Sequence, residues 1–458
     1  MTGSAPQAAP PPAQFDLQVQ TLIIGAGACG LTAALRAHET GQEVLVIEAD
    51  AIPAGSTALS AGLIPAAGTA LQHAAGIDDS ADRFAADIQA KAKGENDPAL
   101  VALLAQTAPR VIDWLHQDKG LPFSVVDDFD YPGHSRRRMH GLPSRSGAEL
   151  IDRLRTACDT AGIDIISQRR AQTLYWQGDR AYGIRAILPD GSTETIGADR
   201  IILATSGFGG NRDLVASNMP DITDALWFGH SGNQGEAILW GKAIGAQTAA
   251  MGAYQGHGNV AHPHGILITW AVITEGGVQV NRHGHRFWDE SQGYSEAARQ
   301  VLAQPGGIAF TIFDSRIAAI ARQFEDFKRA EAQGAIKTAQ SLTDLAEILG
   351  LPASSLQNAV MDRSPSHPDS FGRVFGDGPL SAPFCAVKVT GALFHTQGGL
   401  CVDDLARVRL ANGSVAHNLY AGGGAACGVS GLGDAGYLSG NGLLAAVTLG
   451  FIAGGGAT

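Results

Sequence analysis

Charged residues are scarce in this chain of 458 residues, and basic residues are scarcer than acidic ones. Lys and Arg number 32 against 44 Asp and Glu, which gives a formal net charge of −12. A protein that neutralises nucleic-acid phosphates needs a basic surface, so this balance argues against a nucleic-acid partner. The hydrophobic content of 45% is typical of a globular protein rather than a disordered one.

Cysteine is rare, and long hydrophobic runs are missing. Five scattered cysteines without CxxC spacing predict neither a disulfide framework nor a metal site, and they favour a reducing cytoplasm: Cys29, Cys158, Cys385, Cys401 and Cys427. The longest apolar run, GLLAAVTLGFIAGGG, is short and rich in Gly, so no membrane span is expected. Residues 1–15 lack the basic and apolar regions of a secretory signal, and we interpret them as a disordered leader.

Glycine, in contrast, is abundant, with 59 residues. Such a content provides tight turns and close backbone approaches, which cofactor-binding folds require. Residues 18–50 have the pattern of a buried strand, a Gly-rich turn, a helix that ends at Gly41 and a second buried strand, which is one βαβ unit. Further on, we expect a helix over 148–158, a hairpin of strands 181–188 and 193–196, a strand from residue 200, and a turn at Asn412-Gly413.

The pattern changes between residues 257 and 395, where helical and irregular segments alternate and no βαβ unit is visible. A chain of this length exceeds one ordinary core, so two domains are expected. The simplest arrangement is an α/β, Rossmann-like nucleotide-binding domain over 16–256 and 396–458. An α+β capping domain over 257–395 interrupts it.

The first turn carries a dinucleotide fingerprint. Gly25, Gly27 and Gly30 follow a strand and open a helix, and Glu48 ends the next strand 18 residues after Gly30 (48 − 30). In this context the first glycine permits the turn, the second lets a pyrophosphate approach the backbone, and the third lets helix and strand pack closely. The acidic residue accepts ribose hydroxyls, and the helix N-terminus attracts the phosphates.

Five motifs together resemble one enzyme superfamily. GAGACG, GSTALSAG, ATSGFGGN, HTQGGL and LYAGGG occur in this order, with the cap between the third and the fourth. The set resembles the FAD-dependent fumarate reductase and 3-ketosteroid dehydrogenase superfamily, closest to ketone desaturases of the 3-ketosteroid 1-dehydrogenase kind, from about residue 18 to the end. The resemblance implies one FAD, a cap that closes over its isoalloxazine ring, and hydride exchange between a substrate carbon and flavin N5.

The same resemblance assigns FAD contacts to residues of several loops: Gly25, Ala26, Gly27, Gly30, Glu48, Ser56, Thr57, Ser60, Ala61, Gly62, Ala171, Thr205, Gly207, Gly423 and Gly440. Members similar to succinate dehydrogenase link the flavin covalently to a His in the loop that matches residues 54–69. No His occurs there, so we expect FAD to be bound non-covalently.

Two tyrosines favour dehydrogenation over fumarate reduction. In the reductases an Arg follows the acidic turn of the cap, and another lies in an NRLGGN-like segment, where the two clamp a dicarboxylate. This chain has Tyr294 in RFWDESQGYSEA and Tyr437 in AGYLSGN. Ketosteroid dehydrogenases have tyrosines at both places, and Tyr131 resembles a third, supporting tyrosine. A tyrosine at a helix start is also compatible with a packing aromatic.

The resemblance implies the following chemistry. Tyr294 removes the proton alpha to a ketone, while Tyr437 and a backbone N–H near Gly440 or Asn441 hold the developing enolate oxygen. His257 and His395 stand at substrate-binding places of the reductases, and each is also compatible with a hydrogen-bonded core histidine. The run after Tyr437 departs from the Pro- and Gly-rich run of the steroid enzymes, which favours a cyclic ketone smaller than a steroid, possibly carboxylated, as in an oxocyclohexane.

The sequence therefore predicts an FAD-dependent dehydrogenase that forms a C=C bond alpha,beta to a ketone. The alternative is a flavin reductase of an enone or an unsaturated carboxylate, and an alternative of another class is a non-catalytic flavin carrier. No second dinucleotide fingerprint is visible. We therefore expect a quinone, a dye or oxygen, rather than NAD(P)H, as the electron acceptor.

Overall fold

The structure is a computed structural model that describes residues 6–127, 131–363, 367–376 and 379–455. The chain divides into two compact units. Unit 1 comprises residues 1–218, 229–254 and 395–458, and unit 2 comprises residues 219–228 and 255–394. The predicted cap boundaries lie one or two residues from these limits. The segment 219–228 was not expected to belong with the cap.

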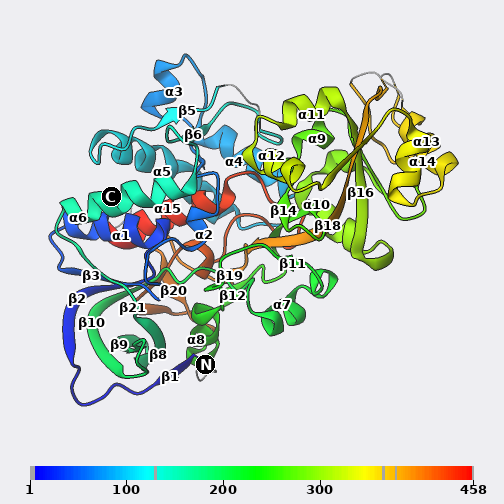
Figure 1. The fold of residues 1–458 in the computed structure, drawn as a ribbon. Helices are drawn as coiled ribbons and strands as arrows, with labels where there is room; N and C mark the ends of the chain where they lie inside the picture. Colours follow the sequence, from blue (N-terminus) through cyan, green and yellow to red (C-terminus); the bar gives the residue numbers. More distant parts are fainter. Residues whose placement is uncertain (1–5, 128–130, 364–366, 377–378, 456–458) are drawn as a thin grey trace. The chain divides into compact units, whose positions relative to one another are not determined.

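Unit 1 is built on a nine-stranded sheet in the order β1-β8-β9-β10-β2-β3-β7, with β21 paired to β10 and β20 paired to β21. The first strands along the chain are β1 Gln7–Ala9, β2 Leu17–Ile24, β3 Val44–Ile47 and β7 Asp164–Ile166. They are followed by β8 Arg170–Gln177, β9 Arg180–Ile187, β10 Thr193–Leu203, β20 Arg407–Arg409 and β21 Val415–Ala421. In Figure 1 β2, β3 and β10 lie side by side in one sheet.

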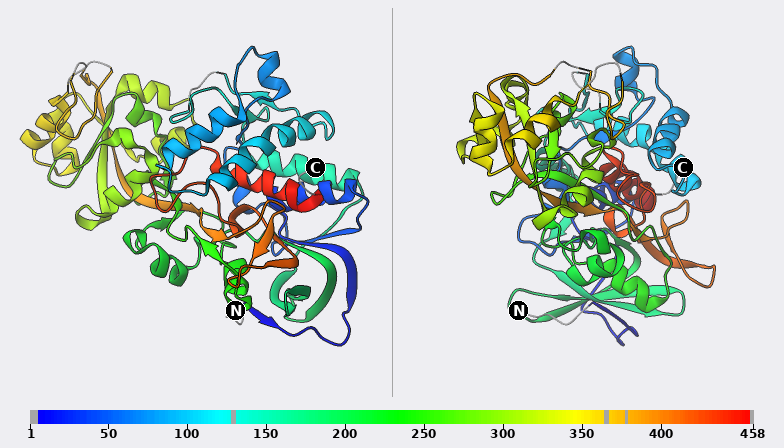
Figure 2. Two further views of the ribbon diagram at one scale, coloured as in Figure 1. Left: turned by 180° about the vertical axis from the view of Figure 1, so that it is seen from behind. Right: turned by 90° about the vertical axis from the view of Figure 1, so that its right-hand side faces the viewer.

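The predicted βαβ unit is confirmed. β2 and β3 pair in parallel, and α1 Ala28–Glu39 connects them. α1 packs along α15 Asn441–Gly455, and the two helices run beside each other in Figure 2. α5 Pro98–Gln117 and α6 Gly147–Thr160 lie against these helices, and α6 confirms the helix expected over 148–158.

The expectation of a disordered leader is wrong for its described part. Residues Gln7–Ala9 pair in parallel with Thr173–Tyr175 at the free edge of β8. Pro6 and Pro10 flank this segment. Because proline has no N–H to donate to a neighbouring strand, a segment bordered by prolines is suited to the edge of a sheet. A Pro-rich chain is already extended, so it loses little conformational entropy when it pairs with a strand. The segment can therefore be ordered although it contains few hydrophobic residues.

The predicted hairpins form, but two of the expected strands are joined into one. Leu188 N–H donates to the Ser192 carbonyl at 2.9 Å, which closes the turn between β9 and β10, and Leu410 N–H donates to the Ser414 carbonyl at 2.8 Å around the Asn412-Gly413 turn. The strands expected from residues 193 and 200 are one continuous strand, β10. β8, with the mixed sequence RAQTLYWQ, was not predicted.

Unit 2 is an α+β unit with a seven-stranded sheet in the order β14-β13-β18-β16-β15, to which β11 and β17 add at β18. Its strands are β11 Leu226–Trp227, β13 Tyr254–Ala261, β14 Ile266–Leu267, β15 Val278–Val280, β16 Ile308–Asp314, β17 Ile336–Ala339 and β18 Phe384–Thr396. Its core gathers residues from the sheet and from α9 Ala271–Thr274, α11 Ser315–Ala321, α12 Glu325–Ala332, α13 Leu342–Leu349 and α14 Ala353–Met361. The α/β class with an α+β insertion is confirmed.

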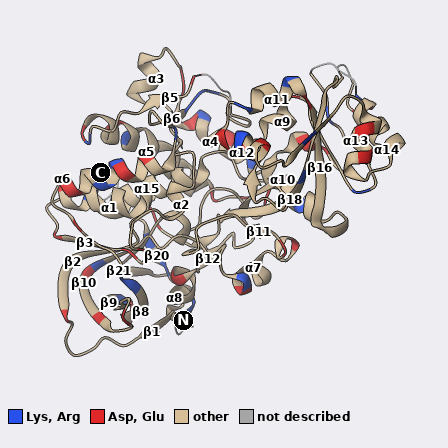
Figure 3. Cartoon of the chain, in the orientation of Figure 1, with Lys and Arg blue, Asp and Glu red and all other residues tan. Residues whose placement is uncertain are grey.

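In Figure 3 Lys and Arg are interspersed with Asp and Glu along the elements of both units. Within the described residues, no helix combines the length and the apolarity that crossing a bilayer requires.

Candidate active site

The dinucleotide turn has the geometry that its glycines predicted. Gly25 has a φ of +107°, and a Cβ there would lie 2.4 Å from the Ala204 carbonyl oxygen. A Cβ on Gly30 would lie 1.9 Å from the Gly25 carbonyl oxygen, so helix and turn pack too closely for any side chain. At Gly27 a Cβ would meet only the Thr57 hydroxyl, at 3.6 Å, so this face of the turn is open to a ligand.

Glu48 closes the turn from the end of β3. One carboxylate oxygen accepts the Ala26 N–H at 2.8 Å and the other accepts the Asp50 N–H at 2.9 Å. Thr57, in α2 Gly55–Ala58, accepts the Ala28 N–H at 3.1 Å and so holds the predicted flavin loop against the start of α1. The Thr205 Oγ1 atom is buried and has no hydrogen-bond partner among the described residues.

Three loops meet at Asn233. The Asn233 side chain donates to Ser56 Oγ at 2.9 Å and accepts from Ser206 Oγ at 2.6 Å. It also accepts the Gly207 N–H at 3.3 Å. Asn233 is buried and was missed by the sequence analysis, although it lies in the Gly-rich segment SGNQG that resembles the other loops.

The remaining FAD candidates are distributed around these loops. Ser60 donates to the Thr57 carbonyl at 2.7 Å, Gly62 packs on Ser146, and Ala61 is exposed. A Cβ on Gly207 would meet Thr396, and a Cβ on Gly423 would lie 3.2 Å from Cys29 Cβ at the start of α1. Ala171 is buried in β8, two residues after Arg169, whose N–H donates to the Glu48 carbonyl at 2.8 Å.

Tyr437 lies beside His395 in unit 1. Their ring centroids are 5.4 Å apart, with the planes inclined by 75°. A chain of hydrogen bonds reaches the imidazole: Asn441 donates to Ser430, Ser430 to Gln397 Oε1, and Gln397 Nε2 to His395 Nδ1, over 3.0, 2.7 and 2.9 Å. With the Gln397 amide in this orientation, His395 carries its proton on Nε2. Burial lowers the pKa of His395 to about 4, so the ring is neutral at physiological pH.

Tyr131 and Gly440 border the same side chain. Tyr131 packs against a small cluster that contains Met139, and a Cβ on Gly440 would lie 3.4 Å from Met139 Cε and 2.6 Å from Pro65 Cδ. Unit 1 thus brings Tyr131 to the neighbourhood of the turn that follows Tyr437.

In unit 2 Tyr294 begins α10, Tyr294–Leu302, and stacks on His257. The ring centroids are 5.1 Å apart, and the planes are inclined by 19°. Phe394 stacks on His257 at 5.5 Å, Phe228 stacks on Phe394 at 4.9 Å, and Trp270 meets the His257 ring edge-on at 5.7 Å. Phe228 explains why residues 219–228 group with this unit, because β11 pairs with β18 beside Phe394.

His257 is neutral and has a defined tautomer. The Asn259 backbone N–H donates to His257 Nδ1 at 3.1 Å, so Nδ1 carries a lone pair and Nε2–H is the donor. Burial lowers the pKa of His257 to about 3. Tyr294 therefore packs on an uncharged ring.

The arginines of the cap segment are paired with carboxylates. Arg286 forms buried ion pairs with Glu290 and Asp369, and Arg373 forms another with Glu290 at 3.0 Å. Glu290 also accepts the Gln279 N–H at 2.9 Å, so its carboxylate holds the backbone of β15 as well as the two arginines. Arg316 pairs with the half-buried Glu275 at 3.7 Å.

Comparisons with known proteins identify the family. A family model described as an FAD binding domain matches residues 20–443. The chain is 31% identical over 448 residues to a probable fumarate reductase of Shewanella frigidimarina, an alignment that covers 95% of this chain and 74% of that protein. It is 24% identical over 501 residues to the 4-oxocyclohexanecarboxylate 2-dehydrogenase of Sinomonas cyclohexanicum, over 87% of this chain and 86% of that protein.

Solved structures agree. The open conformation of a flavocytochrome c3 fumarate reductase superposes with a TM-score of 0.82 at 28% identity, over 96% of this chain and 78% of that one. The 3-ketosteroid-delta4-(5alpha)-dehydrogenase of Rhodococcus jostii has the same fold, with a TM-score of 0.78 at 23% identity over 98% and 99% of the chains. The chain belongs to this FAD-binding flavoprotein family.

This flavoprotein is an FAD-dependent oxidoreductase that acts on carbon–carbon bonds, and the residues present fit FAD. Gly27 leaves the approach to the turn open, and Thr205 Oγ1 is a buried polar atom that a ligand can satisfy. The Ala28 amide at the start of α1 and the carboxylate of Glu48 flank this turn. When bound, FAD supplies a two-electron acceptor for hydride.

The sequence analysis missed the residues that support the candidate catalytic groups. Gln397 lies inside the motif HTQGGL, and Phe394 directly precedes that motif. Ser430, Phe228 and Trp270 come from distant segments and carried no motif. Their roles follow only from the packing.

Proposed function

We propose that this flavoprotein is a dehydrogenase that introduces a C=C bond alpha,beta to the carbonyl of a cyclic ketone smaller than a steroid. The observation that carries the proposal is that each candidate tyrosine packs on a neutral histidine, His257 for Tyr294 and His395 for Tyr437. Uncharged phenol and imidazole groups suit the carbonyl end of a ketone, whereas the two charges of a dicarboxylate need compensating positive charge.

The proposed roles follow from the chemistry of the groups. Tyr294, as the phenolate, accepts the alpha proton, and FAD, when bound, would supply the acceptor for the hydride of the beta carbon. Tyr437 O–H, with a backbone N–H near Gly440 or Asn441, donates to the carbonyl oxygen as negative charge develops on it. Tyr131 supports this pair.

Tyr294 begins a helix, which supports its role as a base. The N-terminal end of a helix favours negative charge by about 0.3–1 kcal/mol, and a side chain at the first position lies near that end. An ordinary tyrosine has a pKa of about 10, so only a small fraction of such phenols is ionised at neutral pH. Dehydrogenation is therefore expected to be faster at alkaline pH.

A carboxylated ketone, of the oxocyclohexane type, is the substrate class that we propose. The relative from Sinomonas cyclohexanicum, named for 4-oxocyclohexanecarboxylate, supports it. His257 Nε2–H is a neutral donor that can bind one carboxylate oxygen. The electron acceptor is proposed to be a quinone, a dye or oxygen. The five free thiols fit a reducing cytoplasm.

The second candidate function is reduction of an enone or an unsaturated carboxylate. The 31% identity with a probable fumarate reductase favours it. In this case Tyr294 donates a proton and Tyr437 holds the substrate. The two functions differ in direction, so anaerobic mixing with saturated ketones and with unsaturated acids distinguishes them.

A further inference from the structure

Tyr131 and His134 are the two ends of a tight turn. The His134 N–H donates to the Tyr131 carbonyl at 3.1 Å, and Pro132 and Gly133 occupy the two central positions. Gly133 has a φ of +86°, which a turn with Pro followed by Gly requires. The turn thus fixes where His134 lies relative to the proposed supporting tyrosine.

The same turn contacts the segment after Tyr437. His134 Nε2 lies 3.0 Å from the Ser439 carbonyl oxygen, and because a carbonyl only accepts, Nε2 carries the proton and donates it. A Cβ at Gly133 would lie 2.7 Å from Leu438 Cδ1, so Leu438 packs directly on the turn. The Asn441 N–H then donates to the Leu438 carbonyl at 3.0 Å and leads into α15.

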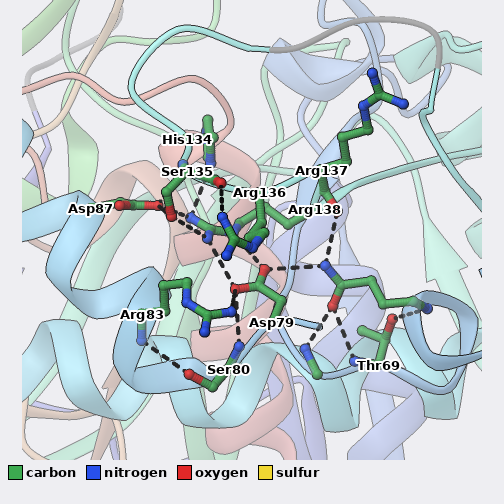
Figure 4. A network of polar contacts seen from close by, with 12 residues as sticks. Thr69, Asp79, Ser80, Arg83, Asp87, His134, Ser135, Arg136, Arg137 and Arg138 are labelled. Carbon is green, nitrogen blue, oxygen red and sulfur yellow. Dashed lines mark hydrogen bonds and ion pairs between the residues drawn. The ribbon is translucent and has the colours of Figure 1, made fainter. Parts of the chain in front are cut away.

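A buried ion-pair network anchors His134 from the other side (Figure 4). Arg138 is 1% exposed, binds Asp79 through two nitrogens at 2.9 and 3.1 Å, and binds Asp87 through a third. That third nitrogen lies 3.5 Å from His134 Nδ1, which it faces as a donor. Arg136 and Arg137, its neighbours in the chain, are exposed, whereas Arg138 is buried in this network.

Phe84 completes the anchor. Its ring stacks on His134 with centroids 6.0 Å apart, and the Arg138 guanidinium lies 4.8 Å from the centroid of the Phe84 ring. His134 is therefore held on the Nδ1 side and on one ring face, and it presents a single donor, Nε2–H, to Ser439.

We infer that His134 is a positioning residue, whose hydrogen bond to the Ser439 carbonyl fixes the segment 437–441 and couples it to the turn that carries Tyr131. The inference rests on the proposed function for its catalytic consequence. The hydrogen bond and the packing of Leu438 on Gly133 are independent of that function. By fixing this segment, the bond sets where Tyr437 O–H lies. This position affects the rate, because misplacement of a hydrogen-bond donor by about 1 Å can lower the rate about a hundredfold.

The test compares His134→Met with His134→Gln in the FAD-loaded protein. The side chains are similar in size, but only Gln has an N–H donor. We expect amide hydrogen exchange over residues 437–441 to be about five- to tenfold faster in His134→Met, the factor for one lost hydrogen bond, and near wild type in His134→Gln. With a ketone that the wild type oxidises, kcat falls about 10–100-fold in His134→Met while KM stays within about threefold, and His134→Gln restores kcat.

Three results would overturn the inference: unchanged exchange in His134→Met, faster exchange with unchanged kcat, or equal impairment of both variants. If His134→Met loses FAD or unfolds, His134→Phe replaces it, because a phenyl ring keeps the stacking on Phe84 without a donor. If no ketone is oxidised by the wild type, the proposed function fails, while the exchange measurement still decides whether His134 holds the segment.

Discussion

His257 and Tyr294 stack with 5.1 Å between their ring centroids. The imidazole is neutral, with its proton on Nε2, because the Asn259 N–H occupies Nδ1 and burial lowers its pKa to about 3. A charged imidazole next to Tyr294 would stabilise a phenolate, whereas this one supplies shape and a neutral donor. Tyr294 must therefore lose its own proton before it can act as a base, because only the phenolate accepts a proton.

Replacing Tyr294 with Phe removes the proposed base and keeps the stacked ring. We expect kcat for ketone dehydrogenation to fall by about 10²–10⁴, the usual contribution of a general base. FAD content and the flavin absorbance spectrum should not change. Tyr182→Phe, in β9, is the matched control and should leave kcat unchanged. Retention of turnover by Tyr294→Phe would show that Tyr294 only packs.

The pH dependence separates Tyr294 from the histidines. If a phenol is the base, kcat/KM rises with pH through the alkaline range, towards the ordinary tyrosine pKa of about 10. His257 and His395, with pKa values lowered to about 3 and 4, stay neutral above pH 5 and produce no inflection there. An inflection near pH 6–7 that disappears in His257→Gln would assign the base to His257 instead.

The glycines of the dinucleotide turn should respond differently to alanine. Gly30→Ala places a Cβ 1.9 Å from the Gly25 carbonyl oxygen and should destabilise the apoprotein. Gly27→Ala finds its nearest neighbour, the Thr57 hydroxyl, at 3.6 Å, so the apoprotein should keep its stability. The methyl group blocks the approach of the pyrophosphate, and we expect weaker FAD binding by calorimetry. Equal FAD affinity in Gly27→Ala would contradict this role.

The dinucleotide turn could be predicted because its information is local. The spacing of Gly25, Gly27 and Gly30 after one strand, with Glu48 after the next, lies within a single βαβ unit. The stack on His257 could not be predicted in this way. It joins Phe228 and Phe394 through the pairing of β11 with β18, and strand register over that sequence separation leaves no local pattern. β8 was missed because Gln172 and Thr173 are polar although they are buried, so its sequence shows no regular pattern of hydrophobic residues.

Acidification should destabilise the protein from about pH 6.5. Burial lowers the pKa values of His134, His140, His257 and His395 to about 3–4, so between these values and 6.5 the unfolded chain binds more protons than the folded one. Stability is therefore present above pH 6.5 and is lost as the pH falls, by up to about 1.4 kcal/mol per pH unit for each histidine. Denaturant unfolding at pH 7, 6 and 5 measures this slope.

A control for the acid effect is His140→Gln. His140 Nδ1–H donates to the Arg138 carbonyl at 2.9 Å, and Nε2 of the neutral ring accepts from the Thr69 hydroxyl at 2.9 Å; the residue is fully buried. Gln does not titrate, so the variant should lose stability less steeply between pH 6.5 and 5, even if it is less stable at pH 7. A slope equal to that of the wild type would mean that His140 is not neutral in the folded protein.

The direction of the reaction is tested most directly by anaerobic titration of the FAD-loaded protein. Saturated cyclic ketones, with and without a carboxylate, are added one at a time, and the flavin absorbance near ~450 nm is followed. Our account predicts that at least one such ketone bleaches the flavin, and that Tyr294→Phe abolishes the bleaching. It is contradicted if every ketone fails while the chemically reduced protein is reoxidised by an unsaturated acid, which would make Tyr294 the proton donor of a reductase.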